Sequence, residues 1–302
     1  MSSEPKVYRI SPASRSADTA LPVDEEFRNQ FDARVAQGHE IARRSSVCFV
    51  GMARDIAGVL PFSLQRIEQI GELFDRWTAV VVENDSRDGT KDVLREWEAR
   101  RRNVVADIRD FGRERLAGFE PLRVQRYAEY RTRYRDIAAT TWTRPDYVVA
   151  VDFDPWGGWS VEGVLNGIAW MDAMPSAAGM ASVSLYEQPW QSTDKEGETG
   201  SVLCHYDQWA WRWQGWRQRM EPWFPLWLPP PGSPPIRCKS AFGALCIYRP
   251  EPFFECAPVS IDGDIEHVGL HKQMASRGWE FFINPSQRTL MHWIPSESDV
   301  IG

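Results

Sequence analysis

The sequence lacks the features that would place the protein outside the cell or across a membrane. Its five cysteines are odd in number and none forms a CxxC pair, so neither a disulfide framework nor a zinc site is indicated. No apolar run approaches the roughly 20 residues that a bilayer-spanning helix needs, and no basic segment precedes an apolar one at the amino terminus. We expect reduced, mostly buried cysteines and a cytoplasmic protein whose membrane contact, if any, is peripheral.

An excess of positive charge is also missing. The 35 Lys and Arg residues are outnumbered by 42 Asp and Glu residues, and the formal net charge is −7. This argues against a general nucleic-acid-binding protein, which must neutralise phosphates with basic side chains. The sequence Gly51-Met52-Ala53-Arg54 is not a glycine-rich phosphate loop with a lysine. With 302 residues, 43% of them hydrophobic, the chain can bury a substantial core, and we expect one main domain.

Strand and helix signals alternate from residue 45 onward. Apolar β-branched runs predict buried strands, and apolar residues three and four apart predict helices that pack on them. We expect strands at residues 46–51, 78–84, 104–108, 147–152, 179–185, 242–248 and 281–283. We expect helices that contain residues 64–74, 93–97, 122–141 and 264–275. Residues 1–44 are more polar and predict a flexible arm followed by a short helix.

The most informative segment is an apolar run that begins at Tyr147 and ends in Asp152-Phe153-Asp154. Residues two apart on a strand share a direction, so both carboxylates can face one cation or its bound waters. Open α/β sheets bind ligands at the carboxyl ends of their strands, and paired carboxylates suit a Mg²⁺ or Mn²⁺ ion that carries a diphosphate. The alternative is a pair of solvated charges. We favour sugar transfer from a nucleotide diphosphate.

A second polar segment, Glu83 to Thr90, follows the strand expected at residues 78–84. Its residue types suit a turn and a helix cap, so the segment could be structural. That interpretation does not explain an acidic residue at the end of an apolar strand, where carboxylates commonly bind ribose hydroxyls. We therefore predict that Glu83, Asn84 and Ser86 contact the nucleotide. Arg54, just after the first strand, is placed to meet the diphosphate or the base.

Three elements, taken in order, resemble the fungal capsule-associated mannosyltransferase family. They are Glu83-Asn84-Asp85-Ser86-Arg87-Asp88-Gly89-Thr90, the Asp-Phe-Asp element, and Glu266-His267 with Asn284-Pro285 downstream. The resemblance covers roughly residues 45 to 293. It implies a GT-A fold, which is Rossmann-like with a central mixed sheet flanked by helices, and metal-dependent transfer of mannose from GDP-mannose with retention of configuration. Because sugar choice drifts easily among GT-A enzymes, we carry over the reaction class and leave a UDP-sugar donor open.

We expect this organisation to divide the chain unequally. Residues 1–44 would be the polar arm, and residues 45–302 a single catalytic domain. Within that domain, residues 45–160 would bind the nucleotide sugar and residues 161–302 the acceptor. The second half would include a Trp- and Pro-rich insertion at residues 188–236.

The resemblance also implies a metal site and a diphosphate site. Asp154 and the late His292 would hold the ion, and Asp152 would reach a metal-bound water or the ribose. Imidazole suits Mn²⁺ better than Mg²⁺, so His292 favours manganese. In the Arg-rich helix before Asp152, Arg126 and Arg131 are the candidates for the diphosphate, because a guanidinium fork complements its oxygens. On its own, such a charge run is usually a solvated helix face.

Glu266 is the predicted active-site carboxylate, with Asp264 in reserve. Glu266 would act as the base of an inverting reaction, or as the stabiliser or nucleophile of a retaining one. The alternative is purely structural, because acidic residues complement the dipole at a helix amino terminus.

Six of the fifteen tryptophans lie between Trp209 and Trp227. They could pack as a small aromatic core or, together with Trp156 and Trp159, form the wall of an acceptor cleft. We predict a glycosyltransferase that uses a saccharide or glycoconjugate acceptor. The rival functions are nucleotidyl transfer and a catalytically inactive carbohydrate-binding protein of the same fold.

Overall fold

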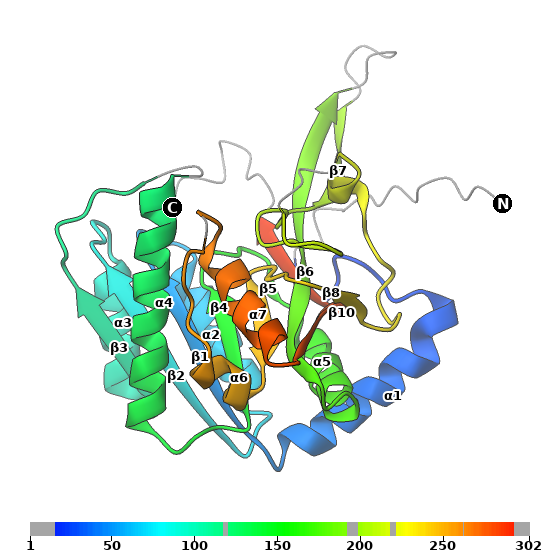
Figure 1. The fold of residues 1–302 in the computed structure, drawn as a ribbon, viewed down its shortest axis with the longest axis horizontal. Helices are drawn as coiled ribbons and strands as arrows, with labels where there is room; N and C mark the ends of the chain where they lie inside the picture. Colours follow the sequence, from blue (N-terminus) through cyan, green and yellow to red (C-terminus); the bar gives the residue numbers. More distant parts are fainter. Residues whose placement is uncertain (1–15, 117–119, 192–198, 218–221, 262, 293–302) are drawn as a thin grey trace.

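The computed structural model describes residues 16–116, 120–191, 199–217, 222–261 and 263–292, and Figure 1 shows a sheet with helices on both faces. The helices are α1 Glu25–Ala42, α2 Leu60–Gly71, α3 Thr90–Arg100, α4 Pro121–Thr141, α5 Val161–Ala173, η1 Phe224–Leu226 (a 3₁₀-helix), α6 Pro250–Glu255 and α7 Glu266–Ser276. The strands are β1 Ser46–Ala53, β2 Arg76–Asn84, β3 Val104–Arg109, β4 Tyr147–Asp152, β5 Gly158–Trp159, β6 Ala177–Gln191, β7 Thr199–His205, β8 Ile236–Cys238, β9 Leu245–Tyr248 and β10 Glu280–His292.

The strands form one mixed sheet in the order β3-β2-β1-β4-β9-β6-β10-β5, and β7 and β8 pair with β6 and β10. Strands β3, β2, β1 and β4 run parallel to one another. Strand β9 lies antiparallel to β4 and β6, and β10 runs parallel to β6. The chain leaves β1 for β2 on one side and returns to β4 on the other. Open α/β sheets bind ligands at such a reversal, beyond the carboxyl ends of the strands.

Side chains alternate between two apolar layers along the parallel strands. In β1, Cys48 and Val50 contribute to the layer covered by α4, α6 and α7. Val47 and Phe49 contribute to the opposite layer, which α1, α2, α3 and α5 cover. Fully burying one such Val or Phe side chain contributes roughly 1.5–3 kcal/mol. This double coverage explains why the parallel strands have continuous apolar sequences.

The amino-terminal part of the described chain, which includes helix α1, packs against the rest of the domain. Helix α1 has 18 residues, so it is longer than the short helix expected, and it lies against α5. Gly38 makes this approach possible, because a Cβ atom at this position would overlap the carbonyl oxygen of Leu165. Before the helix, Ala17 donates a backbone hydrogen bond to Gly157, and the buried Arg288 donates to the carbonyl of Leu21. Residues 1–15 of the predicted arm lie outside the described residues.

Most expected strands and helices are confirmed within a few residues, and the differences lie mainly in the second half. The last strand, expected at 281–283, continues as β10 through Asn284 to His292. Helices α5 and α6 and strands β5, β7 and β8 were not among the expected elements. Among the residues that the structure describes, no helix is both long and apolar enough to cross a bilayer.

Candidate active site

A cavity of about 250 Å³ opens beyond the carboxyl ends of β1, β2 and β4. Its lining also includes the loop after β7, the start of α7 and the first half of α4. The sheet reversal therefore coincides with a concave surface that carries both acidic and basic groups. The predicted site residues that line it are Arg54, Asn84, Arg126, Arg131, Asp152, Asp154 and Glu266.

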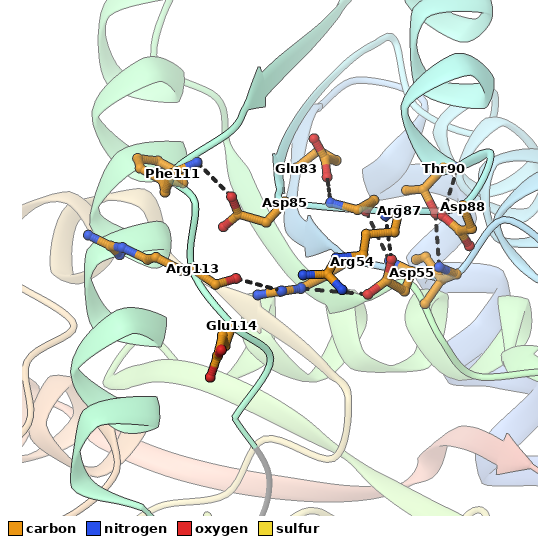
Figure 2. A network of polar contacts seen from close by, with 12 residues as sticks. Arg54, Asp55, Glu83, Asp85, Arg87, Asp88, Thr90, Phe111, Arg113 and Glu114 are labelled. Carbon is orange, nitrogen blue, oxygen red and sulfur yellow. Dashed lines mark hydrogen bonds and ion pairs between the residues drawn. The ribbon is translucent and has the colours of Figure 1, made fainter.

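The turn after β2 is tied to the loop after β1 by residues of the segment from Glu83 to Thr90. Figure 2 shows this network from close by. The amide of Ala57 donates to Asp88 Oδ2, and the amide of Ile56 donates to Thr90 Oγ1, each at 2.9 Å. The amide of Arg87 donates to Asp55 Oδ1 at 2.7 Å. Most of this motif therefore fixes the shape of the sheet edge.

Glu83 and Ser86 belong to the same framework. Glu83 is fully buried, and its Oε1 accepts the amide proton of Ser86 at 2.7 Å. Burial raises the pKa of Glu83 above its ordinary value, while the hydrogen bond to Ser86 lowers it. The Ser86 hydroxyl accepts the amide proton of Asp55 at 2.9 Å. Neither side chain lines the cavity, so their contact with a nucleotide stays a prediction; Asn84 does face the cavity.

A segment after β3 lines the cavity beside β1 and β2 and is held by hydrogen bonds with neighbouring residues. Asp85 accepts hydrogen bonds from the amides of Phe111 and Gly112 at 2.6 and 2.7 Å. Arg54 donates from Nη2 to the carbonyl of Arg113 at 2.8 Å (Figure 2). From α4, Arg126 donates to the carbonyl of Glu114 at 2.8 Å. Two of the predicted phosphate-binding arginines thus also position this covering segment.

The carboxylates at the end of β4 face the cavity, as their spacing predicts. Both line it; Asp152 is partly buried and Asp154 is exposed. Loss of bulk water around Asp152 raises the pKa of this carboxyl to about 7, and the negative charges of Asp154 and Asp207 act in the same direction. Among the described residues, no three acidic, histidine or cysteine side chains converge into a metal site. The site therefore offers a pair of carboxylates for a cation.

His292 is the last residue of β10, and its side chain lies outside what the structure describes. Its backbone pairs with Tyr186 of β6. The preceding residue, Met291, lines the cavity and accepts a backbone hydrogen bond from Trp156 at 2.8 Å. The chain thus brings His292 close to the loop that carries Asp154, and its role as a metal ligand stays a prediction.

A buried arginine links Glu266, the predicted catalytic carboxylate, to Asp152 of the predicted metal site. Arg131 donates from Nε to Glu266 Oε1 at 2.7 Å, and its Nη2 lies 3.6 Å from Asp152 Oδ1. The side chains of Arg131 and Glu266 are 5% and 3% exposed. Arg131 also donates to the hydroxyl of Tyr134 at 3.2 Å and lies over the ring of Phe242. Because its guanidinium is occupied in this way, Arg131 is placed to hold Glu266 and Asp152 in position.

His267 lies beside Glu266 and stacks on Phe242 with ring centroids 3.9 Å apart. Burial lowers the pKa of His267 well below its ordinary value, so the ring is neutral at neutral pH. Its two nitrogens have no hydrogen-bond partner among the described residues. The imidazole is therefore an uncharged part of the cavity lining.

Asp264 lies outside the cavity lining and has a structural partner. It pairs with Arg212, and its Oδ1 also accepts the amide proton of Ile265 at 2.9 Å. Arg212 is buried and donates to the carbonyls of Trp209 and Trp211 at 2.9 and 2.7 Å. Asp264 therefore anchors the Trp-rich segment to the start of α7, and no observation supports the reserve catalytic role.

Most of the described tryptophans in the Trp-rich segment pack with one another. Trp211, Trp227 and Phe224 have ring centroids between 5.0 and 6.1 Å apart, and Trp213 and Trp223 cover them. This is the small aromatic core that was one of the two alternatives. The cleft alternative holds for Trp209, which lines the cavity. Trp159 is buried in the opposite apolar layer and cannot form a cleft wall.

Asp207 is a cavity-lining carboxylate that no sequence pattern indicates. It follows β7, and its two oxygens accept amide protons from Gly243 at 2.8 Å and Ala210 at 3.2 Å. Burial raises the pKa of Asp207, and these two hydrogen bonds lower it. The only signal in the sequence is an acidic residue between aromatic ones.

Comparisons with known proteins bear on the fold alone. No protein-family model matches the sequence, and no curated protein matches it. Solved structures do match. GalNAc-T7 with UDP, GalNAc and Mn²⁺ is 14% identical, covers 97% of this chain and 57% of that chain, and has a TM-score of 0.52. The chain has a GT-A fold.

Two further structures match with lower TM-scores. The mannosyltransferase PcManGT from Pyrobaculum calidifontis, in complex with GDP-Man and Mn²⁺, is 13% identical, covers 87% of this chain and 66% of that chain, and has a TM-score of 0.48. S. aureus TarS 1–349 is 9% identical, covers 81% of this chain and 59% of that chain, and has a TM-score of 0.46. The chain therefore spans between 57% and 66% of the length of these three neighbours.

Proposed function

We propose that the protein is a metal-dependent glycosyltransferase that moves a hexose from a nucleotide-diphosphate sugar to a saccharide or glycoconjugate. The observation that carries the proposal is the gathering of Asp152, Asp154 and Glu266 around one cavity at the sheet reversal of a GT-A fold. The family resemblance favours GDP-mannose, and a UDP-sugar is the alternative donor. The fold supports the reaction class and leaves the donor to experiment.

The nucleotide would occupy the side of the cavity formed by β1 and β2. Asn84 lies there at the end of β2, with Arg54 after β1. Arg126 reaches the same space from α4, so two guanidinium groups are available to the diphosphate oxygens. The segment that Arg54 and Arg126 hold over this side would exclude water from the bound phosphates.

The ion that the proposal requires would be held by Asp152 and Asp154. Their hard oxygen ligands fit Mg²⁺ or Mn²⁺. Burial is the main cause of the raised pKa of Asp152, and the negative charges of Asp154, Asp207 and Glu266 add to it, so a bound cation would favour the charged carboxylate. Two carboxylates are enough, because such ions commonly complete their shell with substrate phosphates and water. When bound, the ion neutralises the leaving diphosphate. His292 is the proposed third ligand.

Glu266 would act at the reacting centre. Arg131 keeps it buried, ion-paired and fixed relative to Asp152, so its carboxylate does not have to reorganise when the substrates bind. In an inverting reaction Glu266 would take the proton of the acceptor hydroxyl, and in a retaining reaction it would stabilise or attack the anomeric carbon.

The test is a thermal-shift measurement with GDP-, UDP-, dTDP- and CMP-sugars, with and without Mn²⁺. A ligand that binds only the folded protein raises its melting temperature by mass action, so the cognate donor can be found before the acceptor is known. Asp154→Asn is the informative variant. Asp136→Asn is the matched control, because Asp136 is exposed on α4 and does not line the cavity.

We expect a shift with one nucleotide class that requires Mn²⁺, disappears in Asp154→Asn and persists in Asp136→Asn. Turnover of the same donor, followed by mass spectrometry, would then establish transfer or hydrolysis. If the folded wild-type protein shows no shift with any donor, the proposal is wrong. If donors bind but are never turned over, a carbohydrate-binding protein without activity is the better description.

A further inference from the structure

Three cavity-lining residues lie across Asp154 from the proposed nucleotide side. Tyr206, Asp207 and Trp209 follow β7, which pairs with β6. In the sheet, β4 separates β1 and β2 from β6, so this cluster and Asn84 contribute to the cavity from opposite sides of the β4 carboxylates. A sugar transferred at β4 therefore has the nucleotide on one side and this cluster on the other.

The carboxylate of the cluster is fixed in place. Asp207 accepts hydrogen bonds from the amides of Gly243 and Ala210, one on each oxygen. Gly243 adopts a left-handed conformation with φ of 65°, and a Cβ atom there would overlap the carbonyl oxygen of Ser182. A carboxylate oxygen can accept more than one hydrogen bond, so Asp207 retains acceptor capacity for a hydroxyl in the cavity.

The neighbouring rings present apolar surface beside this carboxylate. Tyr206 is 51% exposed and is supported from the side by Tyr186, with centroids 5.9 Å apart and planes at 75°. Trp209 is partly buried, and the guanidinium of Arg123 lies 5.4 Å from its ring. Recognition sites for small ligands combine such apolar surfaces with a few fixed polar groups. A pyranose fits both features, because it has a face of C–H groups and a rim of hydroxyls.

We infer that Tyr206, Asp207 and Trp209 form the acceptor subsite, in which a hexopyranose ring packs on the aromatic surface and one of its hydroxyls donates a hydrogen bond to Asp207. The inference rests on the proposed function, because it names the second substrate of the same cavity. According to this inference, the group of the acceptor that enters the cavity is a terminal saccharide and not a peptide or a lipid. It also separates Trp209 from the other tryptophans of its segment, which pack away from the cavity.

The experiment uses saturation-transfer NMR to measure the binding of methyl α-mannoside, methyl α-glucoside and methyl β-galactoside to the protein. The nucleotide diphosphate and Mn²⁺ are present. The variants are Tyr206→Ala and Asp207→Asn. Trp213→Ala is the matched control, because Trp213 is an exposed ring of the same segment that packs on Trp211 outside the cavity. Circular dichroism establishes that each variant is folded.

We expect at least one hexoside to bind the wild-type protein and the Trp213→Ala control. We expect its affinity to fall roughly fivefold in Tyr206→Ala and in Asp207→Asn, since a ring contact or a hydrogen bond each contributes on the order of 1 kcal/mol. Equal binding by all variants, or no binding of any hexoside to the wild-type protein, overturns the inference.

A second arm separates this inference from the proposed function. The thermal shift with the nucleotide sugar is compared with the shift with the nucleotide diphosphate alone, in the wild type and in both variants. If the two substitutions reduce the extra shift due to the sugar, the subsite belongs to the donor and the inference is wrong. If the hexoside binds as expected while no nucleotide does, the subsite stands and the proposed function fails.

Discussion

Replacing Arg131 with methionine tests the central electrostatic feature of the site. Arg131 and Glu266 form an ion pair at 2.7 Å in which both side chains are almost fully buried. Methionine is unbranched and apolar, so it retains part of the packing in which the arginine takes part. What it removes is the positive charge, and with it the hydrogen bond to the Tyr134 hydroxyl. The Glu266 carboxylate is left buried without its partner.

The expected magnitude follows from that geometry. Removing one partner of a buried ion pair costs about 3–5 kcal/mol, because the remaining charge is desolvated and uncompensated. Glu266→Gln should cost about 1–2 kcal/mol, since Arg131 remains 3.6 Å from Asp152 and can still donate to the amide oxygen. The double variant removes both members of the pair. Its cost should fall short of the sum of the single costs by about 1–3 kcal/mol.

The assay is urea unfolding of the wild type and the three variants, followed by the fluorescence of the fifteen tryptophans and by circular dichroism. Coincident transitions of the two signals justify converting midpoints into free energies of unfolding. If Arg131→Met lowers the free energy by less than about 1 kcal/mol, the pair does not act as a buried, uncompensated charge would. If the cost of the double variant equals the sum of the two single costs, Arg131 and Glu266 are not coupled, and the role we assign to Arg131 is wrong.

Three further predictions concern other parts of the fold. Gly38→Ala should lower stability by about 1–3 kcal/mol in urea unfolding, because its methyl group overlaps α5, whereas Gly215→Ala, in open space, should not. Burial raises the pKa of the Cys48 thiol to about 12, and all five cysteines are buried, so Ellman's reagent at pH 8 should react with five thiols only after unfolding. Ala244→Gly should raise the free energy of unfolding by up to about 1 kcal/mol, since alanine at φ 60° is strained; an unchanged or lower value would contradict this.

The sequence predicts the first half of the fold well because its signals there are local. Strands such as β1 and β4 are covered on both faces, so they appear as unbroken apolar runs between turn residues. Helix α5 carries no such signal. Eight of its thirteen residues are buried, including Asn166 and two glycines, so it lacks the polar stripe that identifies an amphipathic helix. Its local signal is the N-cap Ser160, whose hydroxyl accepts the amide proton of Gly163, and its buried surface is explained by tertiary contacts with α1, β10, β6 and β9.

The residues of the candidate site likewise differ in whether a local sequence signal predicts them. Asp152 and Asp154 were predictable as a pair that ends an apolar run and lines the cavity, although β4 itself ends at Asp152, so the period of the strand does not fix the direction of Asp154. Glu83 illustrates the limit: an acidic residue at the end of a strand can serve a ligand or a turn, and only coordinates distinguish the two. Asp207 was not predictable at all. Its position depends on β7 pairing with β6 and on the turn at Gly243, neither of which leaves a pattern in the sequence.

Backbone strain gathers at the same edge of the sheet as the predicted chemistry. Asp55, Asp85 and Ala244 are the described non-glycine residues with positive φ, and each directly follows or lines the cavity wall. A left-handed conformation costs such residues roughly 1–2 kcal/mol, so other contacts must hold it in place. Asp55 and Asp85 hold it with their own carboxylates, and the carbonyl of Ala244 accepts the amide proton of Asp152 at 3.0 Å. Of the three residues, Ala244 is therefore the one whose strained backbone contacts a β4 carboxylate residue directly, whereas Asp55 and Asp85 fix the loops on the other side of the cavity.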